Sequence, residues 1–120
     1  MASAAILAGG QARRLGGVDK SRLIVDGRTI LDRQIDVLRG LSDDLMLVGA
    51  LPDRADPRCR LVEDGSPGLG PLAGLDAALE AMHSDVLLVV ACDMPFITRP
   101  LMQRLLDLAP GVDAVVPRSN

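Results

Sequence analysis

Aromatic side chains are almost absent from this chain of 120 residues, which has one Phe and neither Trp nor Tyr. Proteins that read single-stranded nucleic acid usually stack its bases on aromatic side chains. The charge balance adds to this argument, since 13 basic and 16 acidic residues give a net charge of −3 without a basic stripe. Both observations argue against a nucleic-acid-binding protein.

Histidine and cysteine are also scarce. His83 is the single histidine, and neither Cys59 nor Cys92 has a CxxC partner, which argues against a zinc site. No apolar run approaches the length that crosses a membrane, and the first residues lack the basic and apolar parts of a signal peptide. We therefore expect a reduced, cytoplasmic setting without membrane contact.

The apolar share of the sequence is 48%, which suffices for a globular core built from aliphatic side chains and methionine. A chain of this length forms one domain at most, so we expect a single domain over residues 1–120.

Short apolar runs alternate with helical patterns along the chain. Strands are predicted at 4–8, 23–25, 45–48, 60–62 and 86–91, and a further strand from Ala114 onward. Helices are predicted after a Thr29 cap, from Pro71 to Met82, and after a Thr98 cap. The unbroken Val-rich run at 86–91 is typical of a central parallel strand. This alternation predicts an α/β fold with a mostly parallel sheet.

Apolar spacing also predicts which helix faces are buried. One face of the second helix carries Leu72, Leu75, Leu79 and Met82, and one face of the third carries Leu101, Leu105 and Leu108.

Three distinctive loops follow the carboxyl ends of predicted strands. Gly9-Gly10 follows the first strand, Asp64 and a Gly-rich stretch follow the strand at 60–62, and Asp93 follows the run at 86–91. Ligands of open α/β sheets bind beyond the carboxyl ends of the strands. If these strands are neighbours, the three loops face one crevice.

The residue types in these loops suit a nucleoside triphosphate. Gly9 and Gly10 let backbone N–H groups approach phosphate oxygens closely. Arg14 and Lys20 supply positive charge nearby. Asp93 offers a hard oxygen ligand of the kind that Mg²⁺ prefers.

Two better-known phosphate motifs do not match. A P-loop needs Gly-Lys-Ser/Thr, but Asp19 stands before Lys20-Ser21. The dinucleotide motif GxGxxG is also absent, because Ala8-Gly9-Gly10-Gln11 breaks its spacing. A P-loop NTPase and a dinucleotide-dependent oxidoreductase are therefore disfavoured.

Three short motifs occur in a fixed order. The first is Leu7-Ala8-Gly9-Gly10 with Arg14-Leu15-Gly16 and Asp19-Lys20; the second is Gly70-Pro71-Leu72-Ala73-Gly74-Leu75; the third is Cys92-Asp93-Met94-Pro95-Phe96. Their order and spacing resemble those of molybdenum cofactor guanylyltransferases, over nearly all of the chain.

The resemblance implies a Rossmann-like three-layer sandwich of the nucleotide-diphospho-sugar transferase type. It implies transfer of GMP from GTP to molybdenum-molybdopterin, which forms the guanine dinucleotide cofactor and releases pyrophosphate. It implies Mg²⁺ as cofactor, GTP and molybdenum-molybdopterin as substrates, and transient contact with cofactor-delivery proteins or apo-molybdoenzymes. Neither nucleic acid nor a membrane is an expected partner.

The resemblance also implies a set of site residues. Catalytic roles go to Arg14, Lys20 and Asp93, of which the first two hold the phosphates and the third binds the metal and the triphosphate. The GTP-binding residues are Leu7, Ala8, Gly9, Gly10, Arg14, Lys20, Asp64, Pro71, Leu72 and Asp93. No catalytic His or Cys is needed, because the acceptor phosphate has a second pKa of roughly 6 and is mostly ionised at neutral pH.

Two departures from the family limit the expectation. The family usually carries an asparagine after the second major strand, where this chain has Val48-Gly49. Family members continue well beyond Asn120, and that part completes the sheet and forms much of the pterin side. We therefore expect the N-terminal, nucleotide-binding portion of the domain, with a fold that is incomplete at its C-terminus.

Several alternatives stay open. Asp64 precedes Gly65 and could be a turn residue rather than a ligand. The function could be that of a related cytidylyl or sugar-phosphate nucleotidyltransferase, or of a non-catalytic GTP-binding module. The chain could also be marginally folded, with an exposed sheet edge that promotes aggregation.

Overall fold

The structure is a computed structural model that describes residues 2–8, 14–15, 18–19, 24–25, 28–49, 56–63, 71–91, 94 and 97–115. Its main strands are β1 (Ala2–Leu7), β6 (Ser42–Val48), β7 (Arg60–Val62) and β8 (Leu87–Ala91), and its helices are α1 (Ile30–Arg39), α2 (Pro71–Ala81) and α3 (Arg99–Leu108). Four two-residue strands are β2 (Arg14–Leu15), β3 (Val18–Asp19), β4 (Ile24–Val25) and β5 (Arg28–Thr29).

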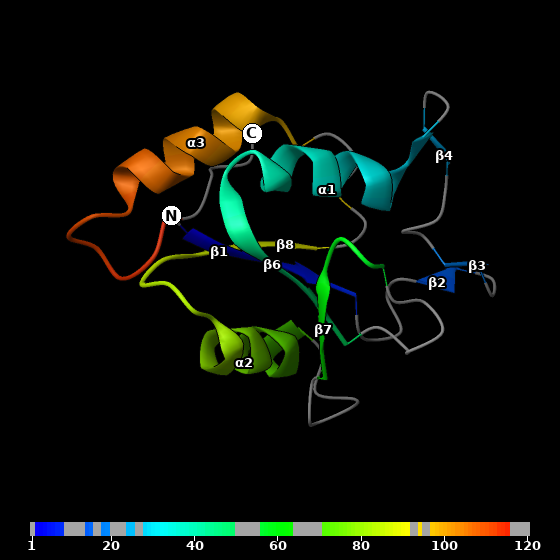
Figure 1. The fold of residues 1–120 in the computed structure, drawn as a ribbon, viewed down its shortest axis with the longest axis horizontal. Coiled ribbons are helices and arrows are strands. Elements are labelled where there is room, and N and C mark those ends of the chain that lie inside the picture. Colours follow the sequence, from blue (N-terminus) through cyan, green and yellow to red (C-terminus); the bar gives the residue numbers. More distant parts are fainter. Residues whose placement is uncertain are drawn as a thin grey trace.

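The four main strands form one parallel sheet in the order β7-β6-β1-β8 (Figure 1). Along the chain they are the third, second, first and fourth main strands, so the order reverses between β1 and β8. The predicted mostly parallel sheet is thereby confirmed. The expected central place of the run at 86–91 is not found, because β8 pairs only with β1 in the described part of the chain. Val89 of β8 is accordingly 38% exposed.

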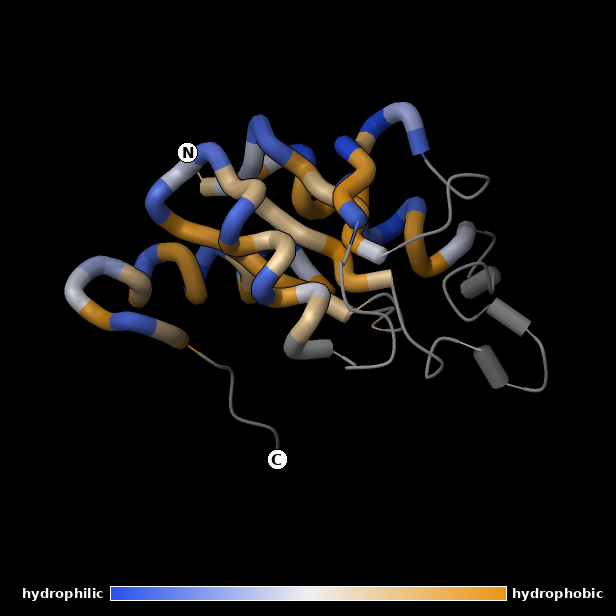
Figure 2. The backbone as a smooth tube through the Cα atoms, turned by 90° about the horizontal axis from the view of Figure 1, so that it is seen from below, coloured by the Kyte–Doolittle hydropathy of each residue, from blue (hydrophilic) through white to orange (hydrophobic). Residues whose placement is uncertain are grey.

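Helices cover both faces of the sheet, with α1 and α3 on one side and α2 on the other (Figure 1). Successive strand residues point to opposite faces. Ala4 and Ile6 of β1 belong to the core under α1 and α3, whereas Ala5 and Met46 belong to the core under α2. Hydrophobic residues gather in the middle of the molecule, whereas many of the outer bends of the chain are hydrophilic (Figure 2). The structure thus has the expected three layers.

The predicted helix caps are confirmed. Thr29 caps α1, where its Oγ1 accepts a hydrogen bond of 3.0 Å from the Asp32 N–H. Thr98 caps α3 in the same way, with 3.3 Å to the Leu101 N–H. Pro71 is the first residue of α2, where its missing N–H costs nothing.

The predicted buried face of α3 is partly wrong. Leu101 and Leu108 are 38% and 47% exposed, while Met102 is the buried residue at 3%. Met102 packs with Ile97 and the sheet, and Leu105 lies at the edge of that core. The helix is therefore rotated relative to the face that leucine spacing alone suggests.

The predicted face of α2 is also partly wrong, since Leu79 is 51% exposed. The helix instead approaches the sheet through the small residues Gly74 and Ala78. A Cβ added at Gly74 would lie 3.3 Å from Leu7 Cδ2 and 3.8 Å from Val48 Cγ1. Small residues thus bring α2 close to the ends of β1 and β6.

The short strands and the segment at Ala114 differ in part from the prediction. β4 pairs with β5, which confirms the predicted strand at Ile24 and Val25. β2 pairs with β3, with Arg14 opposite Asp19, in a segment that was expected to be a loop. The strand predicted from Ala114 is wrong for Ala114 and Val115, which pair with no described strand after the turn at Gly111.

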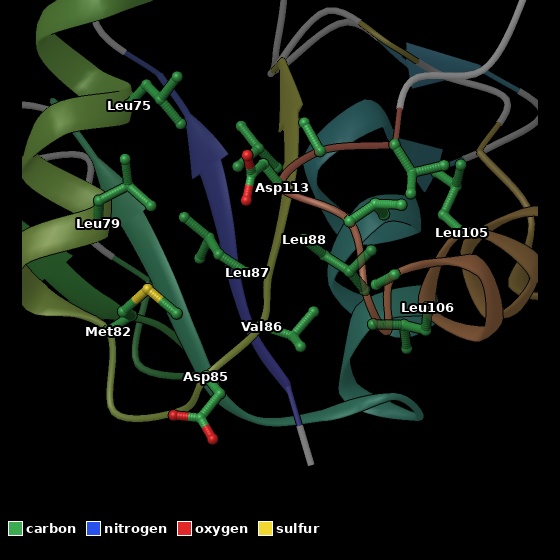
Figure 3. Close-up of a pocket in the computed structure, with 15 residues that line it drawn as sticks. Leu75, Leu79, Met82, Asp85, Val86, Leu87, Leu88, Leu105, Leu106 and Asp113 are labelled. Carbon is green, nitrogen blue, oxygen red and sulfur yellow. The ribbon is translucent and has the colours of Figure 1, made fainter.

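An apolar groove of about 530 Å³ runs along the outer side of β8. Leu75 and Leu79 of α2 line one side together with Met82, which follows the helix, and Leu105 and Leu106 of α3 line the other (Figure 3). Within the described ranges, no helix is both long and apolar enough to span a membrane.

Candidate functional site

The strands β1 and β8 end side by side at the carboxyl edge of the sheet. Leu7 is the register partner of Ala91 on one side and of Val48 on the other. The Ala8 N–H continues this pairing with a hydrogen bond of 2.8 Å to the Val48 carbonyl. The chain therefore leaves β1 and β8 as neighbours, at the point of reversed strand order where open α/β sheets bind ligands.

Leu7 and Ala8 are the two predicted nucleotide contacts at the end of β1 that the structure describes. Ala8 is 5% exposed and belongs to the core under α1 and α3, while Leu7 packs against the core under α2. Since the Ala8 side chain is buried, any contact of Ala8 with a nucleotide would come from its backbone.

The first turn of α2 reaches the same edge of the sheet. Pro71 and Leu72 begin this helix, and Gly74 packs against Leu7 and Val48. The second sequence motif and the end of β1 therefore lie close together, as the sequence predicts for parts of one site.

Other predicted site residues are only partly described. Arg14 lies in β2 and is the register partner of Asp19 in β3, the residue that precedes Lys20 in the sequence. Five predicted residues lie outside the described residues: Gly9, Gly10, Lys20, Asp64 and Asp93.

Gln34 was missed by sequence reasoning, although it contacts the site. It is fully buried on α1, and its Nε2 donates to the carbonyls of Ala91, at 2.7 Å, and Met94, at 2.9 Å. The Met94 N–H also donates to the Ala91 carbonyl, at 3.2 Å. A signal was present in the sequence, because Gln34 stands four residues from Ile30 and from Leu38, on the apolar face of α1.

A charged network lies at the opposite, amino edge of the sheet. Asp44 accepts hydrogen bonds from Ser3 Oγ at 2.8 Å, from the His83 N–H at 3.2 Å and from the Arg60 guanidinium at 3.0 Å. Burial alone would raise the pKa of Asp44, but these hydrogen bonds outweigh it and lower that pKa below its ordinary value of 3.8. The network stabilises the fold at the edge remote from the candidate site.

Two further groups are structural rather than reactive. Arg58 pairs with Asp56 and Asp32 at 2.8 and 2.7 Å, and their hydrogen bonds raise the pKa of its guanidinium. Burial, with Asp56 nearby, raises the pKa of the Cys59 thiol to about 11. Cys59 therefore stays protonated at neutral pH and is a poor nucleophile.

The described residues hold no group of three or more His, Cys, Asp or Glu side chains that could bind a metal ion. The groove beside β8 is not a triphosphate site either, because its lining is mostly apolar and its two acidic residues, Asp85 and Asp113, would repel phosphate (Figure 3). The carboxyl ends of β1 and β8 remain the best candidate.

Comparison with known proteins agrees with this geometry. A family model described as the MobA-like NTP transferase domain matches residues 4–120. The chain belongs to this family.

Curated relatives of this MobA-like chain carry guanylyltransferase names. It is 35% identical to a probable molybdenum cofactor guanylyltransferase of Methanosarcina acetivorans, over 97% of the chain and 56% of the relative. It is 39% identical to a molybdenum cofactor guanylyltransferase of Pseudomonas fluorescens, over 89% of the chain and 55% of the relative. The chain thus spans little more than half the length of these relatives.

Solved structures share the fold. A nucleotidyl transferase from Methanothermobacter superposes with a TM-score of 0.75 at 22% identity, over 90% of this chain and 57% of that one. A 2-C-methyl-D-erythritol 4-phosphate cytidylyltransferase from Thermus thermophilus superposes with a TM-score of 0.65 at 25% identity, over 91% of this chain and 50% of that one. The predicted nucleotidyltransferase fold is confirmed.

Proposed function

We propose that the protein transfers GMP from GTP to molybdenum-molybdopterin and releases pyrophosphate. The observation that carries the proposal is the meeting of β1 and β8 where the strand order reverses, with Leu7 opposite Ala91. The segment that contains Gly9 follows the end of β1, and the segment that contains Asp93 follows the adjacent end of β8. The names of the curated relatives support guanine as the base. A single domain at 1–120 and a cytoplasmic location are further parts of this proposal.

Magnesium suits the proposed site. The β8–α3 turn begins at Ala91, beside the end of β1, and one carboxylate of this turn, that of Asp93, is a hard oxygen donor. Mg²⁺ commonly takes only one or two protein carboxylates and completes its shell with phosphate oxygens and water. A bound Mg²⁺ would neutralise charge on the triphosphate and its pyrophosphate leaving group.

The chain's own residues would align the reactants. Backbone N–H groups of Gly9 and Gly10 would contact phosphate oxygens, and Arg14 and Lys20 would offset the charge that develops on the leaving group. The acceptor phosphate is already mostly ionised near pH 7, with a second pKa of roughly 6. Positioning and charge neutralisation are therefore the work required of the protein.

A second candidate function is a cytidylyltransferase of the same fold. The superposition on the Thermus thermophilus cytidylyltransferase, at 25% identity, supports this second candidate. The two functions share the phosphate contacts and differ in the base, which Asp64 and the Pro71–Leu72 turn would meet.

Pyrophosphate release with purified protein tests the proposal. Mg-GTP, Mg-CTP and Mg-ATP are supplied separately, with and without molybdenum-molybdopterin. We expect release with GTP that depends on the acceptor. A preference for CTP would show that the transferred nucleotide is CMP and not GMP. GTP binding without turnover would support a non-catalytic module.

Matched variants locate the site within the same assay. Asp93→Asn should lower turnover by about 100-fold, the usual scale for loss of one group that stabilises transition-state charge. The control Asp85→Asn changes an exposed carboxylate at the other end of β8 and should leave turnover unchanged. Arg14→Met should weaken GTP binding, whereas Arg104→Met on the exposed side of α3 should not. Equal effects in each pair would contradict the assignment.

A further inference from the structure

Gln34 is a polar side chain at a position built for an apolar one. It has no exposed surface, and its neighbours at helical spacing on α1, Ile30 and Leu38, are buried core residues. Burial of an amide costs free energy unless its donors and acceptor are used. A methionine or leucine would fill this space without that cost, so the amide needs an explanation beyond packing.

The hydrogen bonds of Gln34 fix the orientation of its amide. Its Nε2 faces two acceptors, the carbonyls of Ala91 and Met94, at 2.7 and 2.9 Å. The reversed amide would place an oxygen against both carbonyls and lose both bonds. The side chain therefore joins the first and last residues of the turn 91–94 to α1.

The other half of the amide is unused within the described residues. Gln34 Oε1 is buried and has no hydrogen-bond partner there. An unsatisfied buried acceptor is rare in native structures and calls for an explanation. Gln34 thus offers one acceptor beside the same turn that its two donors hold.

We propose that Gln34 is a positioning residue that fixes the turn 91–94 so that Asp93 is preorganised for Mg²⁺ and the triphosphate. The proposal rests on the proposed function for its metal step, but not for the role of Gln34 in holding the turn. A carboxylate on a turn that opens freely must be ordered each time it binds, which lowers the apparent affinity. Gln34 reduces this loss of affinity, because its hydrogen bonds to the Ala91 and Met94 carbonyls hold both ends of the turn against α1.

Amide hydrogen exchange without nucleotide tests the structural part. Gln34→Met keeps the length and volume of the side chain but removes both donors and the acceptor. We expect exchange at the Met94 N–H, which donates to the Ala91 carbonyl, to become at least tenfold faster in this variant. Unchanged exchange at Met94 would overturn the proposal, whatever the protein catalyses.

Ser3→Ala is the matched control. Ser3 is also fully buried and also donates one side-chain hydrogen bond, but to Asp44 at the opposite edge of the sheet. Its loss should lower stability without changing exchange at Met94. Faster exchange at Met94 in both variants would show a global loss of stability and would overturn the local role.

Magnesium titration with GTP present tests the functional part. We expect Gln34→Met to raise the Mg²⁺ concentration at half-saturation about tenfold, the effect of losing one net hydrogen bond, and Ser3→Ala to leave it within twofold. If exchange quickens but the Mg²⁺ requirement does not change, the link to the metal is wrong. If the unmodified protein binds no Mg-GTP, the proposed function fails, and the exchange result still decides whether Gln34 holds the turn.

A second substitution covers the case in which Gln34→Met does not fold. Gln34→Glu is nearly isosteric, but its carboxylate faces the carbonyls of Ala91 and Met94 with oxygen instead of a donor. It should quicken Met94 exchange at a pH where the carboxylate is ionised and recover part of the protection at lower pH, where a protonated Glu again donates one hydrogen bond. Protection that is independent of pH and equal to that of the unmodified protein would overturn the proposal.

Discussion

Replacement of Asp44 by asparagine should destabilise the fold at neutral pH and should lose its effect in acid. Asp44 is the acceptor at the centre of the network at the amino edge, with Ser3, Arg60 and the His83 N–H as donors. An asparagine at this position keeps the shape of the side chain but loses its charge and presents an NH₂ group where one oxygen accepts.

The expected magnitude follows from the exposure of each partner. Ser3 is fully buried, and its hydroxyl donates to a charged acceptor, which is worth roughly 1.5–3 kcal/mol. The Arg60 side chain is 39% exposed, so its ion pair is screened and adds only about 0.5 kcal/mol. We therefore expect Asp44→Asn to lower the free energy of unfolding by about 2 kcal/mol at pH 7.

The sign of the pH dependence follows from the lowered pKa of Asp44. A carboxyl whose pKa is lower in the folded than in the unfolded protein binds protons less well when folded. Its stabilising effect is fully present above the ordinary value of 3.8 and is lost as the pH falls through the lower, folded value. The difference in stability between the two proteins should therefore shrink below about pH 4.

Urea unfolding followed by circular dichroism, from pH 7 to pH 3, measures this difference. Asp43→Asn, at an exposed neighbouring position, is the control and should change stability by less than about 0.5 kcal/mol. GTP affinity should be unchanged in Asp44→Asn, because the network lies at the edge remote from the candidate site. A destabilisation that is the same at pH 7 and pH 3 would refute the reasoning.

Two further predictions concern α2 and the side of β8 that has no strand partner among the described residues. Gly74→Val should lower the free energy of unfolding by about 1–3 kcal/mol through overpacking against Leu7. Gly74→Ala should be nearly neutral, because a gain in helix propensity of up to about 1 kcal/mol offsets the 3.3 Å contact of its Cβ with Leu7. Equal stabilities of the two variants in urea unfolding would contradict the packing argument. The 120-residue chain should self-associate along β8, and Val89→Lys should reduce this in light scattering. The exposed control Gln103→Lys should not, and an equal effect of both would show that added charge alone is responsible.

Local signals in the sequence predicted the elements well. Caps such as Thr29 and Thr98 act through one side-chain oxygen and nearby N–H groups, so a few residues suffice to recognise them. The end of β6 can also be recognised locally, because Gly49 follows it with a φ of +80°, a conformation that favours glycine. The family motifs likewise lie within short segments and identified the correct family.

Contacts between distant segments could not be predicted in this way. Gln34 meets the turn at Ala91 and Met94 across 57 and 60 residues, and no local pattern encodes such a pairing. The rotation of α3, which buries Met102 instead of Leu101, depends on the sheet it packs against. Within the described residues β8 pairs only with β1, and this depends on which strands are neighbours, whereas its Val-rich run indicates only that it is apolar.

The scarcity of aromatic side chains bears on how the candidate site is held. β1 contributes Ala4 and Ala5 to the two faces of the sheet, and α2 meets that sheet through Gly74 and Ala78. With these small side chains, α2 lies so near β1 that even a Cβ added at Gly74 would lie 3.3 Å from Leu7 Cδ2. The proposed contacts at the end of β1 and in the first turn of α2 would then be set by backbone packing, and the proposed metal turn by Gln34. Variants at Gly74 and Gln34 should for this reason affect nucleotide binding separately, the first through base and phosphate contacts and the second through the Mg²⁺ requirement.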